Sequence, residues 1–272
     1  MSKVSMRAGF RARHFAGFGI FTAAFYVYLY LPIVVLVALS FNSSVSATVW
    51  QSFSLKWYSV ALHNDGLRDA ARNSVTIGLT AAVLATVFAT MAALAISRRQ
   101  RTRLTGSAER LIMLPLVLPE IVVGVATLGF FSAIGLSLGV GNLVIAHTVF
   151  CIPFAYLPVR ARLQGMDTRL EQAAMDLYAR EWQTLRYVTL PLLMPGIVSG
   201  LMLAFVVSLD NFIISVLIAQ AGSTTLPIFI FSLMRMGVTP DVNAASTIIL
   251  SVSVVLVVAS HLVGKSGRKL AS

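Results

Sequence analysis

The chain is a succession of long apolar stretches separated by short polar segments. A helix needs roughly 20 apolar residues to cross a bilayer, and six stretches approach or exceed that length. They are residues 15–39, 74–96, 111–136, 143–159, 192–219 and 244–263. The pattern predicts an all-α membrane protein with six transmembrane helices in one domain, residues 15–264. Short basic segments at 1–14 and 265–272 flank this domain.

One polar interval is long enough to carry structure of its own. It runs from Gly165 to Pro195, between the fourth and fifth apolar stretches. Its apolar positions recur at i, i+3, i+4 and i+7: Leu170, Ala173, Ala174 and Leu177. This spacing predicts a short helix with one apolar face. A weaker pattern of apolar positions follows this helix and ends at Pro191. From the spacing alone, such a helix either lies among lipid headgroups or docks onto a partner.

Composition excludes a water-soluble domain. Hydrophobic residues make up 57% of the 272 residues, charged residues only 11%, and the mean hydropathy is +0.85. Soluble domains carry roughly 25% charged residues. The formal net charge of +11 can indicate nucleic-acid binding, but here the basic residues lie in short loops beside apolar stretches. That distribution is typical of a topology signal in a membrane protein.

The basic residues divide unequally between the two sets of loops. Six spans place 17 of the 21 Lys and Arg residues on one side of the membrane and 4 on the other. The larger set is Lys3, Arg7, Arg11, Arg13, Arg98, Arg99, Arg101, Arg103, Arg110, Arg160, Arg162, Arg169, Arg180, Arg186, Lys265, Arg268 and Lys269; the smaller is Lys56, Arg68, Arg72 and Arg235. Because cytoplasmic loops are enriched in Lys and Arg, both termini and the polar interval are predicted to be cytoplasmic.

The sequence predicts no catalytic residue, metal site or cofactor in this chain. Gly264-Lys265-Ser266 resembles the end of a phosphate-binding loop, but Ala259 stands where that motif needs its first glycine. His147 and Cys151 are spaced i, i+4, and two such residues do not make a zinc site. Any ATP is therefore expected to be bound, with Mg²⁺, and hydrolysed by another polypeptide.

Two acidic residues, Glu120 and Asp210, fall inside predicted spans. A charge at bilayer depth costs about 2.5–3.5 kcal/mol on insertion scales and usually faces a pathway or a partner. No Lys or Arg lies in the spans to pair with them, so a cationic substrate is favoured over a structural ion pair or a protonated carboxyl. Asp210 is expected in the outer part of its span and Glu120 near the middle of the third. Aromatic residues that could add cation–π contacts are Tyr156, Phe150 and Phe212.

The polar interval resembles the cytoplasmic "EAA" loop of permease subunits in binding-protein-dependent ABC importers. The matching positions are Ala173, Ala174, Val188, Leu190 and Pro191. Gln172 stands where that family has Glu, with Glu171 one residue early, and Tyr178 stands where it has Gly. The resemblance implies that a loop at about 163–191 couples the permease to an ATPase. Its implied coupling residues are Leu170, Gln172, Ala173, Ala174, Leu177, Tyr178, Leu190 and Pro191.

Further segments resemble spermidine/putrescine-type permeases, and the similarity covers nearly the whole chain from Tyr28 onward. They are Ser40–Ser44, Lys56–Ser59, Leu203–Asn211, Thr225–Pro227 and Met236–Ala245. The segment Leu203–Asn211 resembles the fifth span of that family, where a pair of acids is usual, and here Asn211 stands in place of the second acid. The predicted substrate pathway consists of Glu120, Asp210 and Tyr156, selected on their chemistry, and of Asn211.

The resemblance implies an ABC importer in a bacterial inner membrane, built from two permease chains, an ATPase dimer and an external solute-binding protein. The implied solute is a polyamine such as putrescine or spermidine; an opine, an amino-acid derivative or an anion is the alternative. Secondary transporters often have internal repeats with interrupted helices in corresponding places; Pro115 and Pro119 near Glu120 could form one such break, but the sequence shows no matching second half. A membrane scaffold leaves the two acids unexplained. The sequence leaves open the exact solute, the host organism, the homo- or heteromeric pairing, and the effect of Gln172 and Tyr178.

Overall fold

The structure, a computed structural model, describes residues 18–45, 49–98, 103–137, 139–236, 240–248, 250–251 and 254. These residues are almost entirely helical, apart from one isolated β-bridge between Asn42 and Phe53. They form two compact units. The first holds the helix α1 (Phe18–Ser40), the loop after it, most of α2 (Lys56–Leu62) and residues 240–248. The second holds α3 to α11.

In the first unit, the loop after α1 is organised around Asn42, which is buried. Its amide nitrogen donates to the carbonyl of Val49 (2.7 Å), and its amide oxygen accepts from the backbone of Gln51 (2.9 Å). Ser40 and Tyr58 share a hydrogen bond of 2.6 Å between their hydroxyl groups. Two of the segments that resemble polyamine permeases, Ser40–Ser44 and Lys56–Ser59, are therefore in direct contact. The predicted first span, residues 15–39, corresponds to α1.

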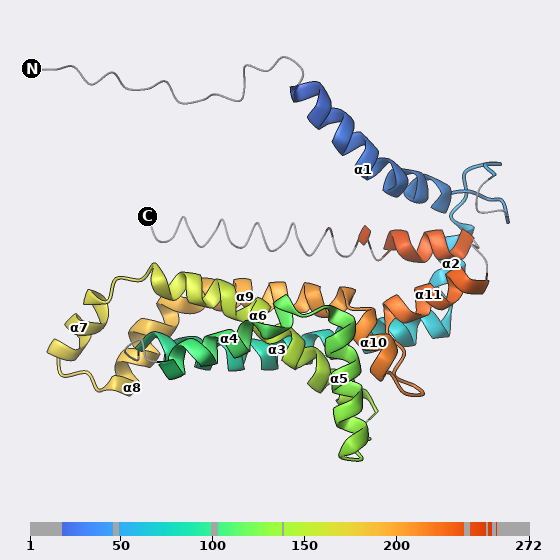
Figure 1. Ribbon diagram of the computed structural model, residues 1–272. Coiled ribbons are helices and arrows are strands. Elements are labelled where there is room, and N and C mark those ends of the chain that lie inside the picture. The colour runs from blue at the N-terminus through green and yellow to red at the C-terminus, as the bar shows by residue number, and fades with distance from the viewer. Residues whose placement is uncertain are drawn as a thin grey trace, which may run out of the picture. The chain divides into compact units, whose positions relative to one another are not determined.

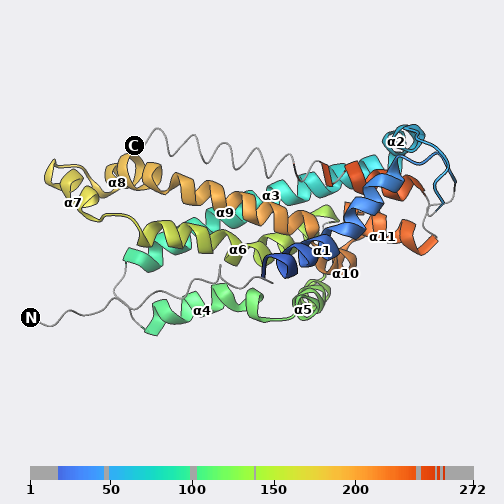
Figure 2. The same ribbon diagram turned by 90° about the horizontal axis from the view of Figure 1, so that it is seen from above.

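Three long helices form the core of the second unit: α3 (Asp65–Arg98), α6 (Val140–Gln164) and α9 (Leu190–Asp210). They run side by side in both views (Figures 1 and 2). Small residues permit the close contacts, because the alanines of α3 facing the core are fully buried. A Cβ on Gly200 would lie 2.7 Å from the carbonyl oxygen of Ala155. Gly196 and Gly200 therefore lie where α9 and α6 approach each other closely, as in the small-residue contacts of membrane helices.

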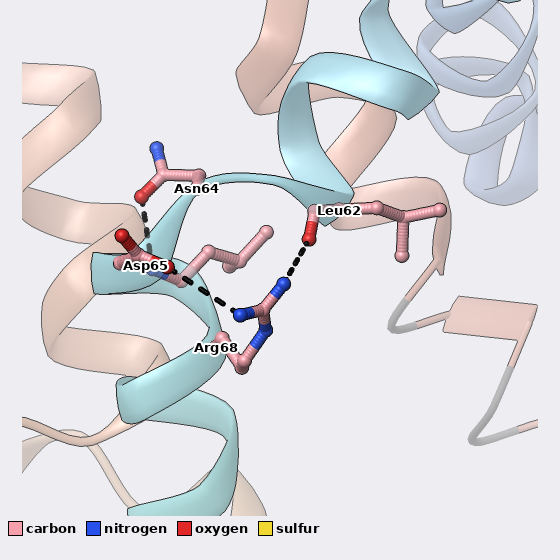
Figure 3. Close-up of polar contacts among 5 residues, drawn as sticks. Leu62, Asn64, Asp65 and Arg68 are labelled. Carbon is pink, nitrogen blue, oxygen red and sulfur yellow. Dashed lines mark hydrogen bonds and ion pairs between the residues drawn. The ribbon is translucent and has the colours of Figure 1, made fainter.

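The helix α3 begins at Asp65, well before the predicted start of the second span at Ser74. Figure 3 shows the reason: Asn64 lies at the start of the helix and its side-chain oxygen accepts from the backbone of Leu67 (3.1 Å). Arg68 donates to the carbonyl of Leu62 (3.1 Å) and to Asp65 (3.4 Å). These bonds satisfy groups that a helix end leaves unpaired, so the polar residues before the span are helical.

The third predicted span, residues 111–136, is not one continuous helix. It consists of α4 (Arg103–Val117) and α5 (Glu120–Ala133), whose axes differ by 108° (Figure 1). Pro119 explains the break, since proline has no N–H to donate and disfavours a helical conformation in the residue before it. Its ψ of 134° is extended, and Glu120 becomes the first residue of α5.

The fifth predicted span, residues 192–219, is also interrupted. The helix α9 ends at Asp210, Asn211 is extended with ψ of 104°, and α10 (Ile213–Ile218) begins two residues later. A turn then leads to α11 (Leu226–Met236). The side chain of Asn73 donates to the carbonyls of Gly222 (3.1 Å) and Thr224 (3.0 Å), which ties this turn to the start of α3.

At the opposite end of the bundle, the polar interval folds into α7 (Arg169–Asp176), α8 (Glu181–Thr184) and the π-helical turn η2 (Leu185–Thr189) (Figure 1). Four described helices are long and apolar enough to cross a membrane, or five if the bent pair α4–α5 is counted as one span. Most of the sixth predicted span, residues 244–263, lies outside the described residues, although residues 240–248 are helical.

Candidate functional site

The two helix breaks bring three polar residues together: Glu120, Asp210 and Asn211, here called the acidic cluster. The side-chain amide of Asn211 and the Asp210 carboxylate both lie close enough to Glu120 to act on its carboxylate. Glu120 opens α5, Asp210 closes α9, and α5 packs against α10. The sequence suggested two successive positions for the acids along a pathway, whereas the structure places them in one cluster.

The conformation of Asn211 decides which of its groups faces Glu120. Its side-chain oxygen accepts a hydrogen bond of 3.1 Å from the backbone N–H of Ile214, within the first turn of α10. The side-chain nitrogen is therefore the group left to donate to the Glu120 carboxylate. Asn211 is buried, so its amide has a fixed orientation at the break between α9 and α10.

The electrostatic surroundings of the two carboxylates differ. Glu120 is half-buried and lies at the N-terminus of α5, where the helix dipole favours a negative charge. Asp210 is exposed and lies in the last turn of α9, where the dipole opposes one. Neither carboxylate forms an ion pair within the part of the chain that the structure describes. The cluster is thus a net negative site with an accessible carboxylate.

Tyr156 does not join the acidic cluster. At a rise of 1.5 Å per residue it lies about 13 Å along α6 from His147, toward the α7 end. It is buried beside the ion pair between Glu109 and Arg160 and lines a cleft of about 740 Å³. Glu171 of α7 also lines this cleft.

The aromatic residues take different positions. Phe150 is buried in the core and packs against Phe154 with ring centroids 5.5 Å apart. Phe212 follows Asn211 directly and packs against Phe231 of α11 at 4.8 Å. The guanidinium of Arg235 lies 4.8 Å from the centroid of that Phe231 ring. The aromatic ring of this cation–π contact therefore packs against Phe212, which directly follows Asn211 of the acidic cluster.

The coupling residues predicted from the loop pattern lie mostly at the surface of this unit. Leu170, Ala173 and Leu177 are exposed, and Ala174 is half-buried. Leu190 and Pro191 form the first turn of α9, where proline is well tolerated because its missing N–H has no helical acceptor there. The apolar face of α7 is thus left uncovered within the described residues of its unit.

Tyr178 explains why the loop pattern has glycine at its position. Its φ is +61°, the one positive value among described non-glycine residues. The helix α7 ends in a Schellman motif: the N–H of Ala179 bonds to the carbonyl of Ala174 (3.1 Å), and that of Tyr178 to Met175 (2.9 Å). This ending needs a left-handed residue, usually glycine. Tyr178 is therefore not part of a regular helix.

The glutamate that precedes Gln172 has a structural partner inside the loop. The hydroxyl of Thr189 donates to Glu171 Oε1 at 2.5 Å, which joins α7 to η2. Gln172 itself is exposed. Since η2 continues directly into α9, the hydrogen bond links the surface helix to a core helix of the bundle.

His147 has a larger role in the fold than its sequence context indicated. It is 1% exposed and contacts two hydroxyls, Ser208 on α9 (Nδ1, 2.7 Å) and Ser215 on α10 (Nε2, 3.0 Å). Sequence reasoning treated it as a packing residue; two serines flanking Asp210 within an apolar stretch were the available signal. Among the described residues, no group of three His, Cys, Asp or Glu side chains could hold a metal ion.

Comparison with known proteins identifies the family. Residues 85–270 match the family described as "Binding-protein-dependent transport system inner membrane component". The chain is 38% identical over 251 residues to the spermidine/putrescine transport system permease protein PotC of Escherichia coli (strain K12), covering 92% of this chain and 95% of PotC. It is also 38% identical over 251 residues to the putrescine transport system permease protein PotI of the same strain, covering 90% and 89%.

A solved structure shares the fold. A chain of a bacterial alginate ABC transporter, crystallised in complex with an alginate pentasaccharide-bound periplasmic protein, superposes with a TM-score of 0.71 at 18% identity, covering 89% of this chain and 90% of that one. The chain therefore belongs to the family of inner-membrane components of binding-protein-dependent transport systems. It is a permease subunit of an ABC importer, as the resemblance of its loop implied.

Proposed function

We propose that this permease moves a polyamine such as putrescine or spermidine, and that the acidic cluster contacts the ammonium groups of the solute. The observation that supports this proposal most directly is that Glu120, Asp210 and Asn211 lie close together at two helix breaks. An exposed carboxylate without an ion-pair partner attracts a cation, and charged residues at bilayer depth usually serve a pathway. The names of PotC and PotI support the same class of solute.

We further propose that the chain crosses a bacterial inner membrane six times with both termini in the cytoplasm. In the bundle, the α7 end carries most of the described basic residues. They are Arg98, Arg103, Arg110, Arg160, Arg162, Arg169, Arg180 and Arg186, whereas Arg68, Arg72 and Arg235 belong to the other end. Because the cytoplasmic side is enriched in Lys and Arg, the α7 end faces the cytoplasm and the acidic cluster lies toward the side where a solute-binding protein delivers its cargo.

Transport follows from alternating access driven by partner subunits. An ATPase dimer binds ATP and Mg²⁺, and its closure moves α7 through the exposed apolar face. The hydrogen bond between Glu171 and Thr189 passes this motion to η2 and then to α9, whose last residue is Asp210. The chain itself breaks no bond; a second permease chain and an external binding protein complete the importer.

A second solute class is favoured by one feature. Asn211 stands where polyamine permeases usually carry a second acid, so this cluster holds less negative charge. Two carboxylates can balance both ammonium groups of putrescine but not all three of spermidine, and an amino-acid derivative with a single ammonium group needs only one of them. The two proposals differ in the number of positive charges on the solute, which a transport assay separates.

The test is solute-stimulated ATP hydrolysis by the complete importer in lipid vesicles, assembled with its own binding protein. We expect putrescine and spermidine to stimulate hydrolysis at micromolar concentrations, while amino acids and opines do not. Stimulation by a singly charged amino-acid derivative, with none by polyamines, would instead support the second proposal. Stimulation by an anion alone would contradict both, since the acidic cluster repels negative charge.

A further inference from the structure

The break between α9 and α10 needs support, because a membrane interior supplies no water to unpaired backbone groups. The carbonyl of Asn211 lies at this break and accepts a hydrogen bond of 2.6 Å from the hydroxyl of Ser215. Ser215 is completely buried. Its hydroxyl therefore fixes the backbone at the residue whose side chain contacts Glu120.

The direction of every hydrogen bond around His147 follows from this contact. Since the Ser215 hydroxyl donates to Asn211, it must accept from His147 Nε2, which therefore carries the hydrogen. In a neutral imidazole Nδ1 is then an acceptor, and it receives the hydroxyl hydrogen of Ser208. The result is a one-way chain from Ser208 through His147 and Ser215 to the Asn211 carbonyl.

The chain joins three helices across the break. Ser208 lies in α9 before the interruption, Ser215 lies in α10 after it, and His147 comes from α6. All three side chains are at least nine-tenths buried. A buried polar chain of this kind is stabilising only when each group is paired, and here each bond fixes the next one.

We propose that His147 is a positioning residue of the acidic cluster: through Ser215 it holds the Asn211 backbone so that the Asn211 amide stays turned toward Glu120. This inference rests on the proposed function, because it makes His147 a determinant of how tightly the permease holds its cationic solute. His147 touches neither the solute nor Glu120 and acts only through the hydrogen-bonded chain. Its removal therefore changes solute affinity before it changes the maximal rate.

The two amide substitutions of His147 separate positioning from packing. In His147→Gln the side-chain nitrogen reaches the place of Nε2 and can still donate to Ser215. In His147→Asn the shorter amide reaches only toward Ser208. The matched control is Thr148→Val, since Thr148 is buried on the same helix and its hydroxyl bonds only to the carbonyl of Val144 within α6 (2.7 Å).

The experiment measures putrescine-stimulated ATP hydrolysis of the reconstituted importer as a function of putrescine concentration. We expect His147→Asn and Ser215→Ala to raise the half-saturating concentration roughly tenfold, as for a lost buried hydrogen bond, with the maximal rate within about twofold. His147→Gln and Thr148→Val are expected to behave like the wild type. Equal impairment by Gln and Asn, or a loss of maximal rate alone, would overturn the positioning role.

A second readout is independent of the solute. A Cβ on Gly124 would lie 2.7 Å from Cδ1 of Leu217, so these two positions mark the contact between α5 and α10. Cysteines at both positions report this contact, and the smaller cysteine at position 217 leaves room for the new side chain at position 124. We expect a short crosslinker to join them in the wild type and in His147→Gln, and far less in His147→Asn. If polyamines do not stimulate the wild type, the proposed function is contradicted, and the crosslinking yield alone then tests the role of His147. Equal crosslinking yields in all variants would disprove that role.

Discussion

Tyr178 is held in a left-handed backbone conformation that side chains rarely adopt. It is 95% exposed, so packing within its unit does not compensate for the strain. A non-glycine residue in this region costs roughly 1–2 kcal/mol relative to the right-handed helix. The Schellman motif at the end of α7 is therefore formed at a cost that a glycine would remove.

Tyr178→Gly is expected to stabilise the end of α7. Relief of about 1 kcal/mol corresponds to roughly fivefold slower hydrogen exchange at the amide of Ala179, which bonds to the Ala174 carbonyl. Hydrogen exchange of the assembled importer, corrected for intrinsic rates, measures this. Leu177→Gly is the matched control, because Leu177 is 82% exposed but has a φ of −85°. Faster exchange in Tyr178→Gly than in the wild type would contradict the strain.

Among the secondary-structure elements, α7 is linked to the transmembrane core in part by the hydrogen bond between Thr189 and Glu171. Thr189→Val keeps the size and the branched shape of the side chain but removes the donor. We expect solute uptake to fall several-fold while basal ATP hydrolysis and assembly persist, because α7 no longer moves rigidly with α9. Ser199→Ala, which removes an exposed hydroxyl that bonds to the carbonyl of Pro195 within α9 (2.8 Å), is expected to leave uptake unchanged.

Parallel assays of uptake and ATP hydrolysis on the same vesicles check this prediction. If Thr189→Val retains the wild-type ratio of solute moved to ATP hydrolysed, the bond does not transmit motion. If the variant fails to assemble, Thr189→Ser, which keeps the hydroxyl, is expected to restore both assembly and transport.

Much of the fold could be predicted from local patterns. Apolar length located α1, α3, α6 and α9. The two helix breaks were not predicted from the sequence, because the apolar stretches continue through them. Pro119 was a visible signal for the first, whereas proline elsewhere, as at Pro153, lies within a regular helix.

The break at Asn211 depends on contacts that no local pattern contains. Ser215 is four residues away, but His147 comes from another helix, and only the folded bundle brings it to the break. The same holds for the candidate site: the sequence indicated Glu120 and Asp210 separately, and the packing of α5 against α10 joins them. Tyr156 was grouped with them on chemistry alone and lies elsewhere along α6.

At the scale of the whole molecule, the distribution of charge predicts how the chain sits in the membrane. Its one native cysteine, Cys151, is buried, so single cysteines introduced at exposed positions can be labelled without interference. An impermeant maleimide is expected to label Asp65→Cys in intact cells, and Tyr178→Cys only after the membrane is opened. Labelling of Tyr178→Cys from outside would place the loop beyond the reach of an ATPase and contradict the orientation.

Asp210 is proposed to attract the cationic solute. Asp210→Asn removes the charge at nearly constant size, and a charge-assisted hydrogen bond contributes about 1.5–3 kcal/mol. We therefore expect the half-saturating polyamine concentration to rise at least tenfold, with assembly intact and partial recovery in Asp210→Glu. The decisive measurement is polyamine uptake by vesicles containing the fully assembled Asp210→Asn importer: a severe loss is predicted, and wild-type uptake would contradict the account.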